Sequence, residues 1–198
     1  MGFDLQKGSS FNLSKEAPSM STGGVGLGWT TEADLDVSAF CLGDDGHIVE
    51  MTDFVFYGSK NKTVLDGEDF PRPFTNCGGV YGAIDAPEGD EEEDGDDEDM
   101  WVYFDEISEN IKEILVVVTI HEPKGVTFSD VSGCYCRIWD ADTENELCRY
   151  VMSEDFSNED AVEIGKFSRD GSGWQFTAIG KGHVGGLQAL ISKFAYRF

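Results

Sequence analysis

Short stretches rich in β-branched and aromatic residues recur along this chain, and glycine-rich turns separate them. The clearest stretches are residues 36–42, 53–57, 101–104, 115–121, 134–139 and 174–179. Such runs are typical of strands, because branched and aromatic side chains pack well on a pleated surface. The chain also has 24 glycines, and strands at such short spacing favour antiparallel pairing. The sequence therefore predicts a mostly all-β fold, an antiparallel two-sheet β-sandwich with one or two short helices and a long acidic loop.

Local patterns refine this picture at four places. Residues 40–50 alternate between apolar and polar side chains around "GDDG", which predicts a hairpin turn. Residues 105–114 carry isoleucines at helical spacing, so we expect one or two helical turns that lead into a buried strand. Residues 158–167 are compatible with a strand or a short helix. Residues 185–194 place four large apolar side chains on one face and are the best helix candidate.

The charge balance restricts the possible partners. The chain has 39 Asp and Glu residues against 14 Lys and Arg, a formal net charge of -25. Such a chain repels nucleic acid phosphates and anionic lipid, so neither nucleic acid nor a membrane surface is an expected partner. The apolar run at 111–120 is too short to span a membrane. The charge suits cations or a basic protein surface.

The cysteines and histidines give no sign of a catalytic or zinc site. The five cysteines form an odd set without a preceding apolar leader, so we expect a reducing, cytoplasmic environment. Cys134 and Cys136 share one face of a predicted strand but lack a second pair at zinc spacing, and we expect them to be buried. His47, His121 and His183 are scattered, and no nucleophile motif accompanies them. We therefore expect a protein that is not an enzyme.

The most unusual segment is acidic. Between Glu88 and Asp99, ten of twelve residues are acidic. An EF-hand that starts at Asp90 fails, because position twelve is Trp101 in place of Glu and no helix precedes it. The surrounding segment 66–100 has little periodicity and predicts a long loop, whose middle has the composition of a disordered tract.

Acidic residues also gather where loops meet predicted strands. The clusters are Asp34 with Asp36, Asp66 with Glu68 and Asp69, and Asp96 with Asp97 and Glu98. Loops of a sandwich can bring such clusters to one edge, and a calcium ion takes about six to eight oxygen ligands. The alternative is that each cluster is a turn or a solvated face, where Asp is common.

Several segments form a combination that is more specific than any one of them. They are "LQKGSSFNLSK", "VGLGWTTEADLDVSAFCLGDDGHI", "DFVFYGS", "GDDED" and "WQFTAIGKGHVGGLQAL". Together they resemble the TerD family, the tellurite-resistance and stress proteins of bacteria and their phages. The resemblance extends over nearly the whole chain and implies a single TerD-like β-sandwich domain over residues 1–198.

The resemblance also implies a function and a site. It implies a non-enzymatic protein that binds Ca²⁺ through acidic loops, with other stress-response proteins as partners. Carried onto matching positions, the metal ligands are Asp34, Asp36, Asp69, Asp96, Asp97 and Glu98.

The chain departs from the family pattern at three places. Thr30 stands where the family usually has Asp, and Gly-Asp-Asn is altered at residues 67–69. An acidic insertion loop lies at about 70–94. A second interpretation of the charge is a metal-independent interaction module that docks a basic protein partner.

Overall fold

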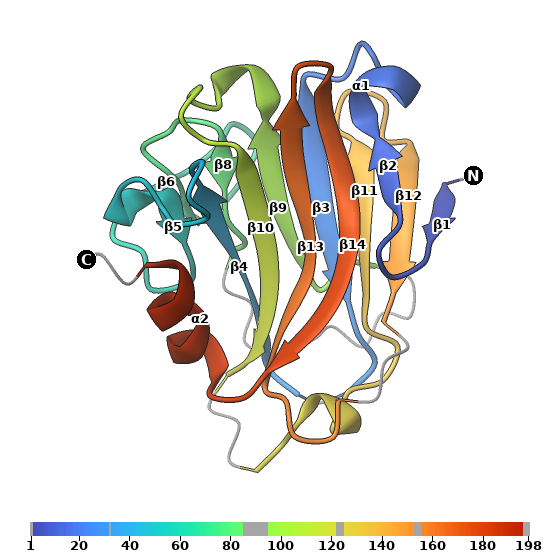
Figure 1. Ribbon diagram of the computed structural model, residues 1–198, viewed down its shortest axis with the longest axis vertical. Coiled ribbons are helices and arrows are strands. Elements are labelled where there is room, and N and C mark those ends of the chain that lie inside the picture. Colours follow the sequence, from blue (N-terminus) through green and yellow to red (C-terminus); the bar gives the residue numbers. More distant parts are fainter. Residues whose placement is uncertain (1, 32, 85–94, 122–124, 153–155, 196–198) are drawn as a thin grey trace.

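The computed structural model describes residues 2–31, 33–84, 95–121, 125–152 and 156–195. Two six-stranded sheets pack face to face (Figure 1). The first sheet has the order β1 (Phe3–Leu5), β12 (Glu146–Val151), β11 (Tyr135–Asp140), β3 (Thr22–Gly28), β9 (Glu98–Tyr103) and β8 (Val80–Tyr81). The second has the order β2 (Ser10–Asn12), β14 (Gly173–His183), β13 (Ala161–Asp170), β10 (Glu113–Ile120), β4 (Leu35–Leu42) and β5 (Phe54–Val55).

Short elements complete the fold. Strands β6 (Lys62–Thr63) and β7 (Arg72–Pro73) form a separate two-stranded sheet. The helices are α1 (Leu13–Glu16), α2 (Gly186–Phe194) and the 3-10 turns η1 (Met51–Asp53), η2 (Phe104–Glu106) and η3 (Phe128–Asp130). Among the described strand pairs, β1 with β12 is parallel and the rest are antiparallel. The predicted β-sandwich is therefore confirmed.

The core lies between the two sheets, and the strand pattern explains it. In β9, Glu98, Met100 and Val102 point inward and are buried, while Asp99 and Trp101 point outward and are half-buried. This alternation is the expected period of two along a strand. The inward side chains of both sheets form one continuous apolar cluster.

The second sheet is also covered on its outer face. Helix α2 packs there, and Leu190 and Phe194 join Phe40, Leu115 and Val117 in a smaller apolar cluster. As a result β4 and β10 are buried on both faces, which explains their continuous apolar sequences.

Most local predictions are confirmed. The helix predicted at 185–194 is α2. Residues 105–114 lead into β10 as predicted, but the helical turn η2 ends at Glu106, before the isoleucines whose spacing predicted it. The segment 158–167 resolves as strand β13, which pairs with β10 on one side and β14 on the other. In the predicted hairpin turn, the Gly43 N–H donates to the carbonyl of His47 at 2.9 Å.

Other predictions were incomplete. Segment 66–100 was expected to be a loop, yet β7, β8 and the start of β9 lie within it. The tract 85–94 lies outside the described residues, so the insertion at about 70–94 stays a prediction. The glycine-rich strand β3 was not predicted. None of the helices in the described residues is long and apolar enough to cross a membrane.

Candidate functional site

Four strand ends meet at one end of the sandwich, toward the bottom of Figure 1. Strand β3 ends beside the start of β9, with Leu27 opposite Glu98. In the other sheet β10 ends beside the start of β4, with Ile120 opposite Leu35. We call this region the acidic end; its polar residues are Asp34, Asp36, Asp97, Glu98 and His121.

Glu98 connects the two sheets. It is the first residue of β9 and its side chain points into the core, where it is 5% exposed. Its Oε2 accepts a hydrogen bond from the N–H of Val37 on β4 at 2.6 Å. A buried carboxylate needs such donors, because an ionised group loses its hydration on burial. Glu98 is therefore a structural bridge at the same place where a metal was predicted.

Asp97 precedes Glu98 and has a well-defined position. Its N–H donates to the carbonyl of Leu27 at 2.8 Å, and its Oδ2 accepts from the N–H of Trp29 at 2.7 Å. Both contacts are to the end of β3. The nearby charge of Asp97 adds to burial in raising the pKa of the Cys134 thiol to about 12.

Asp36 lies on β4 and is buried. Its Oδ2 is 3.0 Å from Nδ1 of His121, the residue that follows β10. The backbone N–H of His121 donates to the carbonyl of Asp34 at 2.8 Å, and the His121 ring packs edge-on against Tyr57. His121 was interpreted from sequence as a scattered histidine. Its position directly after a buried strand, at the same end as Asp36, is the signal that could have identified it.

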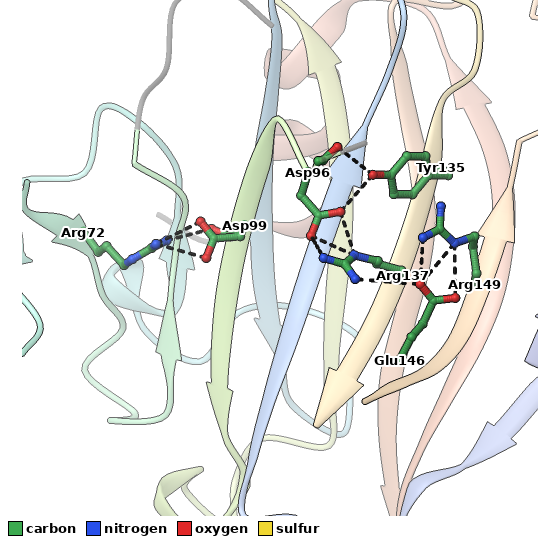
Figure 2. A network of polar contacts seen from close by, with 8 residues as sticks. Arg72, Asp96, Asp99, Tyr135, Arg137, Glu146 and Arg149 are labelled. Atoms are coloured by element: carbon green, nitrogen blue, oxygen red, sulfur yellow. Dashed lines mark hydrogen bonds and ion pairs between the residues drawn. The ribbon is translucent and has the colours of Figure 1, made fainter. Parts of the chain in front are cut away.

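Asp96 points away from these residues, onto the outer face of the first sheet. Figure 2 shows its carboxylate facing Arg137, whose Nε donates to Oδ1 at 2.8 Å. The Tyr135 hydroxyl lies 3.0 Å from the same oxygen and 2.8 Å from the carbonyl oxygen of Gly95, two acceptors that share its one proton. Arg137 and Arg149 both pair with Glu146. The carboxylate of Asp96 is therefore already neutralised by a guanidinium.

A second set of ion pairs forms around Arg72. Arg72 is almost fully buried and its guanidinium meets Asp99 at 2.8 Å (Figure 2). Arg72 also pairs with Glu68, the neighbour of the predicted ligand Asp69. Asp69 itself is exposed in the loop that joins β6 to β7. Glu68, one of the residues that depart from the family pattern, thus forms an ion pair with Arg72.

The six predicted metal ligands therefore do not all lie at one site. Asp34, Asp36, Asp97 and Glu98 lie at the acidic end, whereas Asp96 and Asp69 lie elsewhere. Among the described residues, no three His, Cys, Asp or Glu side chains are arranged to hold a metal ion. The acids at 32 and 122 adjoin this end in sequence and lie outside the described residues.

The fold and this end define a class, the two-sheet β-sandwiches with carboxylates at their strand ends. Within that class the chain belongs to the TerD family, because the TerD domain matches residues 1–194. It is 36% identical over 202 residues to the tellurium resistance protein TerD of Serratia marcescens, covering 98% of this chain and 97% of the relative. It is also 36% identical over 207 residues to general stress protein 16U of Bacillus subtilis (strain 168), covering 98% and 97%.

Solved structures support the fold. The crystal structure of a homologue of telluride resistance protein (TerD) from Streptomyces coelicolor A3(2) superposes with a TM-score of 0.64. That chain is 21% identical, and the match covers 88% of this chain and 96% of the other. The likeness is one of architecture at this level of identity.

Proposed function

We propose that this protein is a non-enzymatic calcium-binding protein of the cytoplasm that acts in tellurite resistance and the stress response. The observation that supports it most is the inter-sheet contact of Glu98 with Val37. It brings one acidic loop end against the strand that carries Asp36. The names of the relatives support the biological setting, and calcium binding is our own inference.

The donor chemistry at the acidic end suits a hard cation. Asp36, Asp97 and Glu98 offer carboxylate oxygens, and the ends of β3 and β4 offer backbone carbonyls. Calcium prefers oxygen donors of both kinds, at flexible coordination number. The bound ion would supply positive charge, and the N–H groups of Trp29 and Val37 orient the carboxylates toward the strand ends.

Binding is also favoured by the charge of the molecule. Two buried carboxylates within a chain of net charge -25 repel each other and the surrounding acids. A divalent cation would cancel part of that repulsion in the folded state. We propose that the ion draws Asp36, Asp97 and Glu98 into one coordination shell.

Titration calorimetry with Ca²⁺ and with Mg²⁺ tests this proposal. We expect the wild type to bind Ca²⁺ more tightly than Mg²⁺, and Asp97→Asn to weaken Ca²⁺ binding by about tenfold or more, because one charged ligand is lost. The matched control is Asp105→Asn, an exposed acid in η2 at the other end of β9. Equal affinities for the two variants would contradict the site, and no heat with the wild type would contradict calcium binding.

A second function is supported by the lack of a formed three-residue metal cluster among the described residues. In that case the chain is a metal-independent acidic module that docks a basic protein. Deletion of residues 85–94 would then remove a binding partner from pull-down experiments. The loss would be the same with EGTA as with Ca²⁺, which distinguishes this function from the first.

A further inference from the structure

Cys77 differs from the other cysteines in its position. It lies in the turn that connects β7 to β8, where the Gly78 N–H donates to the carbonyl of Thr75 at 3.1 Å. Gly78 has φ of +88°, a left-handed conformation that favours glycine and keeps the turn tight. Cys77 is partly exposed, whereas Cys41, Cys134, Cys136 and Cys148 are all buried. Of the five cysteines, Cys77 is therefore the most accessible to a small solute.

Cys41 is a buried cysteine that belongs to the same core as Cys77. It belongs to β4 in the second sheet, is 0% exposed, and forms part of the core between the sheets. Cys77 packs against the same core. Its neighbour Asn76 donates its N–H to the carbonyl of Thr52 at 3.3 Å, in the segment that leads into β5, the strand paired with β4. The turn that carries Cys77 leads into β8 of the first sheet. The two cysteines thus come from neighbouring segments of opposite sheets.

The surroundings make the two sulfurs unequal. The hydrogen bond from Cys41 is the main cause that lowers the pKa of Cys77, and Thr75 and the N–H of Gly79 act in the same direction. The Thr75 hydroxyl is 3.0 Å from the Cys77 sulfur. Burial and the charge of nearby Asp53 oppose this effect. The same hydrogen bond, with burial, raises the pKa of Cys41 well above its usual value, so Cys41 keeps its proton.

We propose that Cys77 and Cys41 form a peroxide-reactive thiol pair, with Cys77 as the attacking sulfur and Cys41 as the resolving one. The partly exposed sulfur, its buried thiol partner and the hydroxyl of Thr75 together form the reactive cluster. This inference is independent of calcium binding and of the acidic end.

The reaction balances with hydrogen peroxide as the oxidant. The Cys77 thiolate attacks one peroxide oxygen, the O–O bond breaks, and the other oxygen leaves as hydroxide and takes up the proton that Cys77 had lost. Cys77 is then a sulfenic acid. The Cys41 sulfur attacks the Cys77 sulfur, the S–O bond breaks, and water leaves with the Cys41 proton. The pair loses two electrons, and one peroxide becomes two waters.

The product would join the two sheets covalently. A Cys41–Cys77 disulfide connects β4 with the turn before β8 and closes the intervening chain into a loop. Such a cross-link restricts the unfolded chain, so the oxidised protein should melt at a higher temperature than the reduced one. Oxidation would thereby make the sandwich more resistant to unfolding under oxidative conditions.

Peptide mapping of the full-length protein tests the proposal. Reduced wild type is treated with hydrogen peroxide, its remaining thiols are alkylated, and a non-reducing digest is analysed by mass spectrometry. We expect a Cys41–Cys77 cross-linked peptide that dithiothreitol removes. In Cys41→Ala, dimedone should label a sulfenic acid at Cys77, and in Cys77→Ser the cross-link should be lost. Cys148→Ala, a buried position on β12, is the matched control and should keep the cross-link.

The wild-type map decides the result even where a variant fails to fold. A wild type in which Cys77 is oxidised to sulfinic acid without pairing to Cys41 would overturn the proposal. So would a peroxide-treated protein in which Cys77 remains reduced, or one in which other cysteines pair first.

Discussion

Gly26 lies in the middle of β3, and the carboxylate of Asp96 lies across its outer side. A Cβ added at Gly26 would overlap that carboxylate, which Arg137 and Tyr135 hold in place. Because the obstacle is itself held by a paired arginine, it cannot move aside without breaking those contacts. Glycine at position 26 therefore makes room for the polar network of Figure 2.

Gly26→Ala should consequently destabilise the protein by about 1–3 kcal/mol, the usual cost of overpacking a well-filled site. Urea unfolding followed by tryptophan fluorescence measures the change. Gly171→Ala is the control, because a Cβ at Gly171 meets open space. If the two variants unfold at the same urea concentration, the close packing of Asp96 on β3 does not contribute to the free energy of unfolding.

Tyr135 should make stability depend on alkaline pH. Burial, and then the neighbouring charge of Asp96, raise the pKa of Tyr135 to about 12. An unfolded tyrosine titrates near pH 10, so between about 10 and 12 the unfolded chain loses a proton that the folded chain keeps. The stability that the protonated Tyr135 contributes to the folded state is therefore fully present below about pH 10, and it is lost as the pH rises through about 12.

Tyr135→Phe removes this titration. Its stability should fall less steeply than that of the wild type between about pH 10 and 12, as measured by thermal unfolding at each pH. Tyr57→Phe offers a comparison at a tyrosine outside this network. Parallel pH profiles for wild type and Tyr135→Phe would contradict the prediction.

At this scale the sequence identified acids but not their partners. Asp96 was expected to face a metal together with Asp97, yet the chain bends at Gly95 and Asp97 before β9 begins at Glu98, and the two carboxylates point to different sides. Asp97 bonds to the end of β3, while Asp96 meets Arg137. Which arginine reaches Asp96 depends on strand order, since β3 lies between β9 and β11. Sequence patterns do not contain that order.

At the scale of elements, a buried carboxylate adds a polar contact to the apolar packing of helix α2 on the second sheet. Oε1 of Glu163 on β13 accepts from Nζ of Lys193 on α2 at 2.5 Å and lies 2.6 Å from Nε2 of His183 on β14. Glu163 is 7% exposed. The contact ties the helix to two strands.

Glu163→Gln should loosen this attachment by about 1–3 kcal/mol, because Lys193 and His183 lose their charged partner. Hydrogen exchange should accelerate in residues 186–194 more than in β10. Glu109→Gln, at an exposed position, is the control. Unchanged exchange in α2 would show that its apolar face alone holds the helix.

Helices and strands were predictable where their packing requires apolar residues at regular spacing in the sequence. Helix α2 was found from its four apolar residues, two of which bury against Phe40 and its neighbours. Strand β3 was missed because its alternate glycines erase the usual strand signal. Those glycines are required by the side chains of Trp139, Asp96 and Tyr135, which cover them. A strand specified by its neighbours' side chains leaves little signal in its own sequence.

At the scale of the whole molecule, the net charge of -25 opposes folding. A compact state brings these charges closer together than the unfolded chain does, so their repulsion lowers stability. Monovalent salt shortens the screening length from about 30 Å at 0.01 M to about 8 Å at 0.15 M. The melting temperature in EGTA should therefore rise with sodium chloride over this range.

Calcium should act differently from general screening. A ligand that binds the folded state stabilises it by RT ln(1 + [L]/Kd), about 2.7 kcal/mol at one hundred times Kd. In 0.15 M sodium chloride most of the diffuse repulsion is already screened, so calcium should still raise the melting temperature, and magnesium at equal ionic strength should raise it less. Asp97→Asn should keep the response to sodium chloride and lose much of the response to calcium. If wild type responds equally to both divalent ions and Asp97→Asn matches it, the effect is screening alone, and the acidic end holds no specific ion.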